Sequence, residues 1–133
     1  MTPELREKLL AGLKDVAGMA LAATAHAQTY PDRNRPIKFI APSGAASVVD
    51  LRARAYGKAI SETSGLNVVV DNRPGAEMVI GVQAFTSSAP DGYTVMITSS
   101  SSQTLNPVML PNLPYDPLKD MIPLTGISQG GLI

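Results

Sequence analysis

The sequence predicts an α/β fold built on a parallel β-sheet of βαβαβ type. Three runs rich in β-branched residues alternate with two stretches that have the apolar spacing of a helix. This alternation is typical of parallel sheets whose strands are joined by right-handed crossover helices. The predicted connections are short, as such units prefer. The chain has 133 residues, of which 44% are hydrophobic, and can therefore form one compact core.

Each strand has a local signal in the sequence. Strands are predicted at 37–41, 66–70 and 93–98, where β-branched and aromatic residues are frequent. The second of these runs is almost continuously apolar, as expected for a strand buried on both faces. A fourth strand is expected at 121–127.

The first predicted helix lies between the first two strands. Asp50 is a favourable N-cap, and the helix is expected to run to about Ser64, where Gly65 provides a stop. The spacing of its apolar residues predicts a stripe that faces the core. That stripe consists of Leu51, Ala55 and Ala59, widened by Tyr56 and Ile60.

A second helix is predicted at 78–88, with Met78, Val82 and Phe85 on one side. Beyond the third strand, the four serines at 99–102 could form a flexible linker or a loop. They follow a strand directly, and their biased composition is not repeated, which favours a loop.

Charge and composition exclude several classes of function. Eleven Lys and Arg balance eleven Asp and Glu, so the chain has no basic field that would attract nucleic acid. Cysteine is absent and His26 is the single histidine, so neither a metal site nor another cofactor is expected. An enzyme is the weaker hypothesis, although catalysis by carboxylates alone stays open.

The first 27 residues have the pattern of a secretory signal peptide. Val16–Ala25 is a run of ten small and apolar residues, too short to span a membrane as a helix. Ala25-His26-Ala27 has the small-x-small form of a signal-peptidase site, which predicts cleavage after Ala27. The alternative is an amphipathic N-terminal helix, whose apolar side chains would be Leu9, Leu10, Leu13 and Val16.

Ligands of parallel α/β sheets bind at the carboxyl ends of the strands, which here points to the loops at 42–49, 71–78 and 99–104. Small residues dominate the first and third loops, so backbone N–H groups are accessible. Two of the loops lead to helix N-termini, which favour anions, and a small carboxylate suits this arrangement. The alternative is that the small residues serve only tight turns. Neither of the glycine-rich nucleotide-binding patterns is present.

A series of short motifs resembles one known family over about residues 30–128. The motifs, in order, are Tyr30-Pro31-Asp32, Pro36-Ile37-Lys38-Phe39-Ile40, Pro42 with Asp50 and Ala53-Arg54, Asp71-Asn72-Arg73-Pro74-Gly75-Ala76, Ala89-Pro90-Asp91-Gly92-Tyr93-Thr94, Asn106-Pro107 and Leu113-Pro114-Tyr115-Asp116-Pro117. In this order they are similar to the extracytoplasmic solute-binding proteins of tripartite tricarboxylate transporters, the Bug type.

The resemblance implies a periplasmic-binding-protein-like fold with two α/β domains and a cleft between them. It implies a periplasmic receptor, not an enzyme, that captures small organic acids and passes them to membrane permease subunits without itself spanning the membrane. Family members are about twice as long or longer, so residues 28–133 are expected to be a partial N-terminal domain. Alternative hypotheses are a degenerate fragment that binds nothing and a small carboxylate-dependent enzyme.

The resemblance also implies where a ligand would lie. The candidate ligand-binding residues are Ser43, Gly44, Ala45, Ala46, Ser47, Asp50, Glu77, Met78, Val79, Ser99, Ser100, Ser101 and Ser102. Asp50 is expected to cap its helix more than to touch a ligand, and Arg73 to fix its turn or pair with a carboxylate.

The chain departs from the family's pattern at three places in these loops. Ala46-Ser47 replaces a Gly-Gly pair, Glu77-Met78-Val79 replaces Gly-Gly-Asn, and Thr98 and Ser101 stand where glycines are usual. A carboxylate at Glu77 would repel an acid ligand unless it points away.

Overall fold

The computed structural model describes Glu4, Glu7 and residues 30–128. The chain divides into two units, Met1–Asp32 and Arg33–Ile133, and the sheet belongs to the second. The predicted cleavage site after Ala27, and the alternative apolar stripe of an N-terminal helix, lie outside the described residues. Within the described residues, no helix has both the length and the apolar character that a membrane span requires.

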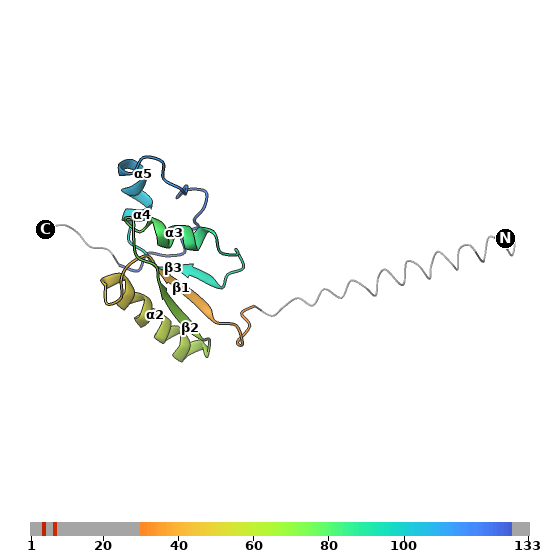
Figure 1. The fold of residues 1–133 in the computed structure, drawn as a ribbon. Coiled ribbons are helices and arrows are strands. Elements are labelled where there is room, and N and C mark those ends of the chain that lie inside the picture. Colours follow the sequence, from red (N-terminus) through yellow and green to blue (C-terminus); the bar gives the residue numbers. More distant parts are fainter. Residues whose placement is uncertain (1–3, 5–6, 8–29, 129–133) are drawn as a thin grey trace. The chain divides into compact units, whose positions relative to one another are not determined.

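The second unit is a three-stranded parallel sheet, which confirms the predicted fold class. Its elements follow one another along the chain in the order shown in Figure 1. They are β1 (Ile37–Ala41), α2 (Val48–Ser64), β2 (Val68–Asn72), α3 (Val79–Thr86), β3 (Thr94–Met96), α4 (Ser101–Thr104) and α5 (Asn106–Met109).

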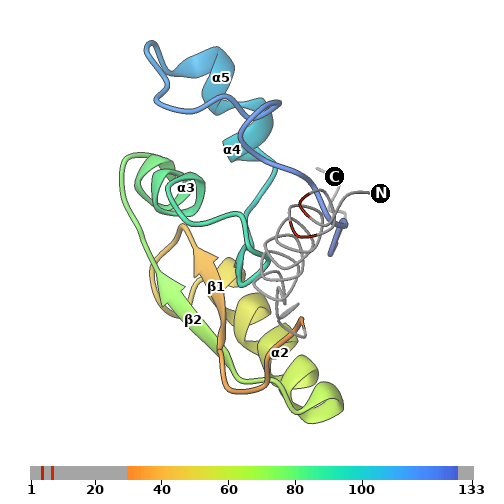
Figure 2. The same cartoon turned by 90° about the vertical axis from the view of Figure 1, so that its right-hand side faces the viewer.

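The strand order β2-β1-β3 places the two crossover helices on opposite faces of the sheet. The chain steps from β1 to β2 in one direction and from β2 to β3 in the other. Crossovers of one hand therefore need α2 and α3 on different sides. Figures 1 and 2 show α2 on one face and α3 on the other, with α4 and α5 beyond α3.

Each face of the sheet has its own apolar core. Phe39, Ala41, Ala53 and Ile97 form the core under α2. Val82 of α3 packs on the opposite side with Tyr115 and Met121, which come from the segment after α5. The alternation of side chains along β1 explains the division, because successive residues of a strand point to opposite faces.

The buried face of α2 differs from the predicted stripe. Leu51 and Tyr56 are 59% and 42% exposed, and the buried residues are Asp50, Ala53 and Gly57. A Cβ placed on Gly57 would lie 3.0 Å from Val68 Cγ1, so α2 approaches β2 through its smallest residues. Of the predicted stripe, only Ile60 packs against this core, whereas Ala55 and Ala59 are exposed as well. The close approach of β2 leaves room for small side chains alone at the centre of the buried face.

Several predicted boundaries are also corrected. The N-cap of α2 is Ser47, not Asp50, because Ser47 has an extended backbone and its hydroxyl accepts from Asp50 N. The second strand lies at Val68–Asn72, later than predicted, because it stays paired with β1 up to Ala41. The predicted loop at 99–104 contains the short helix α4.

The predicted fourth strand is wrong, because 121–128 has no regular secondary structure. Met121 is buried, whereas Ile122 and Leu124 are 82% and 75% exposed. Pro123 cannot donate a ladder hydrogen bond, and a single buried side chain anchors the segment instead of a strand pairing.

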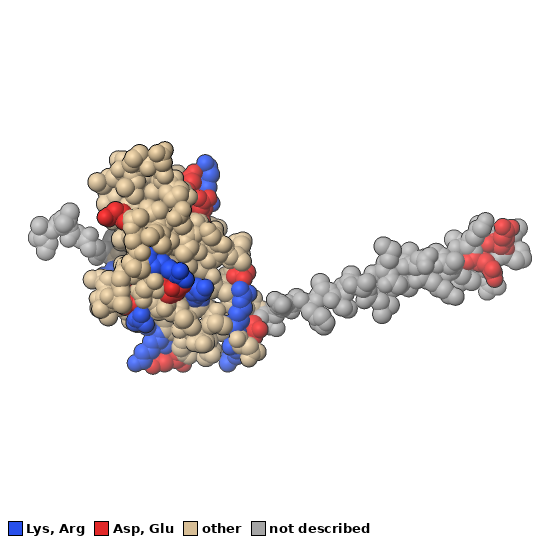
Figure 3. Space-filling model, in the orientation of Figure 1, with Lys and Arg blue, Asp and Glu red and all other residues tan. Residues whose placement is uncertain are grey.

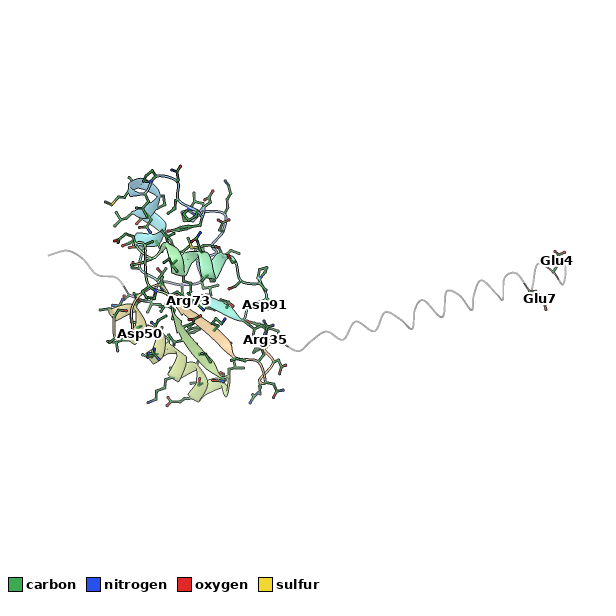
Figure 4. The ribbon with its side chains drawn as sticks, in the orientation of Figure 1. Glu4, Glu7, Arg35, Asp50, Arg73 and Asp91 are labelled. Atoms are coloured by element: carbon green, nitrogen blue, oxygen red, sulfur yellow. The ribbon has the colours of Figure 1, made fainter. Side chains whose placement is uncertain are left out.

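The Asp91 motif has a structural role at the end of the sheet opposite Asp50 (Figure 4). The Asp91 carboxylate accepts from Tyr93 N and pairs with Arg35, whose guanidinium lies 3.9 Å from the centre of the Tyr93 ring. The backbone N–H of Tyr93, followed by Arg35, lowers the pKa of Asp91. These contacts fix the entry of the chain into β3.

Gly75 is expected to be intolerant of a side chain. Its φ is +126°, and a Cβ there would lie 2.6 Å from Ile80 Cδ1. We expect Gly75→Val to destabilise the fold by about 1 kcal/mol or more and to lower the urea midpoint. Gly44→Val is the matched control, because a Cβ at Gly44 meets no atom within 4 Å. An unchanged midpoint for Gly75→Val would contradict the strain at this turn.

Candidate functional site

The loops that follow β1, β2 and β3 meet at the carboxyl edge of the sheet. The start of α3 packs directly on the first two of them. A Cβ on Gly81 would lie 2.4 Å from Pro42 Cβ and 2.9 Å from the carbonyl oxygen of Arg73. Only glycine permits this approach, so Gly81 holds the first loop, the second loop and the N-terminus of α3 together.

Asp50 lies at the centre of the first loop's hydrogen bonds. Its residue is 2% exposed. Oδ2 accepts from Ala46 N at 2.8 Å and from Arg54 Nε at 3.1 Å, and Oδ1 accepts from Asn72 Nδ2 at 3.0 Å. Arg54 Nη2 also lies 3.0 Å from Asp50 Oδ1 and donates to Asn72 Oδ1. Both carboxylate oxygens are therefore occupied by the protein's own donors.

These donors stabilise the charged form of Asp50. The Arg54 hydrogen bond, followed by those of Ala46 N and Asn72, lowers the pKa of Asp50 from 3.8 to about 2. The carboxylate stands in the first turn of α2, where a negative charge is favourable. The positive end of α2 thus already faces an internal anion.

The same network fixes the first loop in place. Asn72 Nδ2 also donates to Ser43 O at 3.2 Å, and the hydroxyls of Ser43 and Ser47 share a hydrogen bond at 2.7 Å. Ala46 has a φ of +62°. Gly44, Ala45 and Ala46 form the exposed part of the loop.

The second loop ends in a run of left-handed residues. Ala76, Glu77 and Met78 have φ values of 45°, 52° and 74°. Met78 is the N-cap of α3 and makes no side-chain cap, and the first turn of α3 contains no acidic residue. Val79 N donates to Ala76 O at 3.0 Å, so the N–H groups without a partner inside α3 are those of the next two residues, Ile80 and Gly81.

The third loop is joined to the second through Met78. Ser99 Oγ donates to Met78 Sδ at 3.5 Å, and Thr98 Oγ1 lies 3.8 Å from the same sulfur. Because the fully buried Ser102 donates its hydroxyl proton to Ser99 O, Thr98 Oγ1 is the donor in its 3.1 Å hydrogen bond with Ser102 Oγ. Hydroxyl groups of this loop therefore face the second loop.

A buried polar chain behind the third loop supports it. Tyr115 Oη donates to Ser102 O at 2.8 Å, and Asn106 Nδ2 lies 3.2 Å from Tyr115 Oη. Asn106 Nδ2 also donates to Glu77 O at 2.7 Å. Sequence reasoning noticed the motifs around Asn106 and Tyr115 but assigned neither residue to the site.

The remaining predicted site residues lie in different environments. Val79 packs against the Val82 core and so contributes to the fold. Glu77 and Ser100 are exposed, and Ser101 begins α4. Arg73 pairs with Asp71, with 3.0 Å between Nε and Oδ1.

Three further observations concern the rest of the described residues. A hollow of about 120 Å³ lies at the other end of α3, lined by Phe85, Thr86, Ser88, Ala89, Pro90, Thr94 and Asp120, and it includes no residue of the three loops. The described residues contain no group of three or more His, Cys, Asp or Glu that could hold a metal ion. On the face shown in Figure 3, positive and negative side chains are interspersed.

The fold is similar to part of two solved periplasmic proteins. A solved structure titled as a periplasmic transporter is 36% identical, with a TM-score of 0.63 over 68% of this chain and 30% of its own. A structure of the periplasmic binding protein BugD is 31% identical, with a TM-score of 0.62 over 68% of this chain and 29% of its own.

The chain belongs to the family described as the tripartite tricarboxylate transporter family receptor, whose model matches residues 52–132. A UPF0065 protein of Bordetella bronchiseptica is 42% identical over 77% of this chain and 30% of its own length. Protein BugT of Bordetella pertussis is 36% identical over 89% of this chain and 36% of its own. The chain thus spans about a third of the length of these relatives, and the family to which it belongs is described as one of receptors.

The Asp50 network predicts a specific dependence of stability on acid. Because folding lowers the pKa of Asp50, its stabilising contribution is complete above its ordinary pKa of 3.8 and is lost as the pH falls towards about 2. We expect Asp50→Asn to be less stable at neutral pH and to lose less further stability between pH 4 and pH 2. Urea unfolding at a series of pH values measures both effects.

Glu62→Gln is the control, because Glu62 makes only an exposed ion pair with Lys58, at 3.8 Å. It should retain the unmodified protein's pH dependence. Parallel curves for the unmodified chain and Asp50→Asn below pH 4 would contradict the assignment.

Proposed function

We propose that this chain captures small organic acids in the periplasm, as the solute-binding component of a tripartite tricarboxylate-type transporter. The observation that carries the proposal is the meeting of three donor-rich loops at the carboxyl edge of the sheet. Membership of the receptor family supports the role of the chain in solute binding.

The polarity of the loops favours an anionic ligand. The uncapped N-terminus of α3 provides N–H donors, and Thr98 and Ser99 add hydroxyls on its other side. The carboxylate of Asp50 is satisfied inside the fold and offers no free acceptor. Hydrogen bonds from such donors to a carboxylate are charge-assisted and stronger than those to neutral acceptors.

Two of the departures from the family's pattern, at Ala46 and Glu77, lie on the exposed rim of the proposed site. The Glu77 side chain therefore remains in water, where its repulsion of an acid is screened. The proposed ligand contacts are backbone N–H groups at the start of α3 and hydroxyls of the third loop, with Ser43 and Ser47 at the first.

The proposed partners are the membrane permease subunits that would receive the ligand. This step follows from the transporter named in the family's description and not from a surface of this chain. The experiments below therefore test ligand capture and export separately.

We expect the chain to bind small carboxylates with a Kd no tighter than millimolar. The loops lie on an open edge, and a ligand there keeps much of its surface in water. Two-dimensional NMR titrations with acetate, succinate, citrate and benzoate should shift resonances of 42–49, 73–82 and 97–102. Calorimetry gives the affinity where heats permit.

Ser99→Ala should weaken this binding, whereas Ser87→Ala at the far end of α3 should leave it unchanged. Shifts absent from all three loops would instead favour a fragment that binds nothing. Micromolar affinity would show that one open edge suffices or that two copies combine to enclose the ligand.

Export is the second test of the proposal. Expression in a Gram-negative host should yield a periplasmic product that begins at Gln28, because Ala25-His26-Ala27 precedes it. Intact mass and N-terminal sequencing of the periplasmic fraction measure this directly. Recovery of only the full 13.9 kDa chain from the cytoplasm would contradict it.

A further inference from the structure

We propose that Met78 determines which acids the edge loops accept, because its side chain occupies the space between the second and third loops that a ligand's carboxylate would enter. The inference rests on the proposed function and names a residue that tunes the same site.

The contacts of Met78 indicate that its sulfur takes the place of a ligand's carboxylate oxygen as the hydrogen-bond acceptor at the third loop. Ser99 Oγ donates to its sulfur at 3.5 Å, and Thr98 Oγ1, whose proton goes to Ser102 Oγ, lies 3.8 Å from the same sulfur. These hydroxyls come from a different strand end, twenty and twenty-one residues away in the sequence. The thioether therefore bridges the two loops at the point where the donors of the proposed site converge.

The hydrogen bonding to the Met78 sulfur is weak, because of the nature of the acceptor. A thioether sulfur is a poor hydrogen-bond acceptor, whereas an ionised carboxylate is a strong one. A carboxylate oxygen that reached Ser99 Oγ would replace a weak neutral contact by a charge-assisted one. The Ser99 hydroxyl thus favours a ligand over Met78 once the Met78 side chain moves aside.

The backbone of Met78 is held while its side chain can move. Met78 O accepts from Val82 N at 3.0 Å in the first turn of α3. The side chain is half-buried and has three rotatable bonds. Displacement of the sulfur therefore does not require α3 to move, and the cost of displacement rises with the space that the ligand needs.

The inference predicts a change in both affinity and selectivity. In Met78→Gly, the Ser99 hydroxyl loses its present acceptor and the space opens, so succinate and citrate should bind about tenfold tighter. Acetate, which needs less room, should gain less. Glycine also suits the positive φ of 74°, so this variant retains the fold.

Two matched variants separate the role of Met78 from general effects. Met109→Ala removes a methionine that is 72% exposed on α5 and should bind as the unmodified chain does. Met78→Leu removes the sulfur but keeps nearly the same volume, and should therefore gain less affinity for citrate than Met78→Gly does. Equal gains in Met78→Gly and Met109→Ala, or equal gains in Met78→Gly and Met78→Leu, would overturn the inference.

A labelled methionine methyl provides a readout that is independent of affinity. In ¹³C-methyl NMR the Met78 resonance should shift when succinate is added, and the Met109 resonance should not. Shifts of the loop amides with an unmoved Met78 methyl would leave the proposed function intact and overturn this inference. If neither the unmodified chain nor Met78→Gly responds to any of the acids, both fail.

Discussion

The buried carboxylate of Asp50 is the interaction on which the carboxyl edge of the sheet depends. It ties together three parts of the chain that are separate in sequence: Ala46 in the first loop, Arg54 on α2 and Asn72 at the end of β2. Removing it would leave their donors facing each other in a largely buried position, which costs more than the loss of a single surface hydrogen bond. The conformation of the first loop is therefore determined by hydrogen bonds to the buried Asp50 carboxylate.

The Asp50 carboxylate also determines which helix N-terminus is available to bind a ligand. Because Asp50 stands at the start of α2, that helix end has its negative partner. The start of α3 has no acidic residue and no side-chain cap, so its donors remain available. Two helix N-termini at one edge are thus divided between a structural role and a proposed binding role. Pro42 and Gly81 keep the first loop in close contact with the start of α3.

The parts of the fold that could be predicted from the sequence are those with local signals. The alternation of β-branched runs and helical spacings predicted a parallel sheet. The carboxyl ends of the predicted strands then indicated the three loops of the candidate site. The buried face of α2 could not be found in this way. Ala53 and Gly57 face the sheet because α2 lies close to β2. The spacing of large apolar residues in the sequence does not indicate that close approach.

The site was predictable in outline and not in its contacts. Asp50 was expected to cap its helix, yet Ser47 caps it and Asp50 binds the loop and Asn72. That partnership joins residues 22 apart and has no local pattern. The roles of Asn106 and Tyr115 are hidden for the same reason, since both support loops far from them in the sequence.

The left-handed run at Ala76, Glu77 and Met78 lies at the carboxyl edge of the sheet, although non-glycine residues disfavour this backbone conformation. Each such non-glycine residue costs roughly 1 kcal/mol or more in isolation. The run persists because its backbone is held from both sides: Val79 N donates to Ala76 O, and Asn106 donates to Glu77 O. Asn106 in turn contacts Tyr115, which belongs to the core under α3. The strain at the proposed site is therefore offset by packing behind it, and the side chain of Met78 is held at the junction of two loops as a consequence.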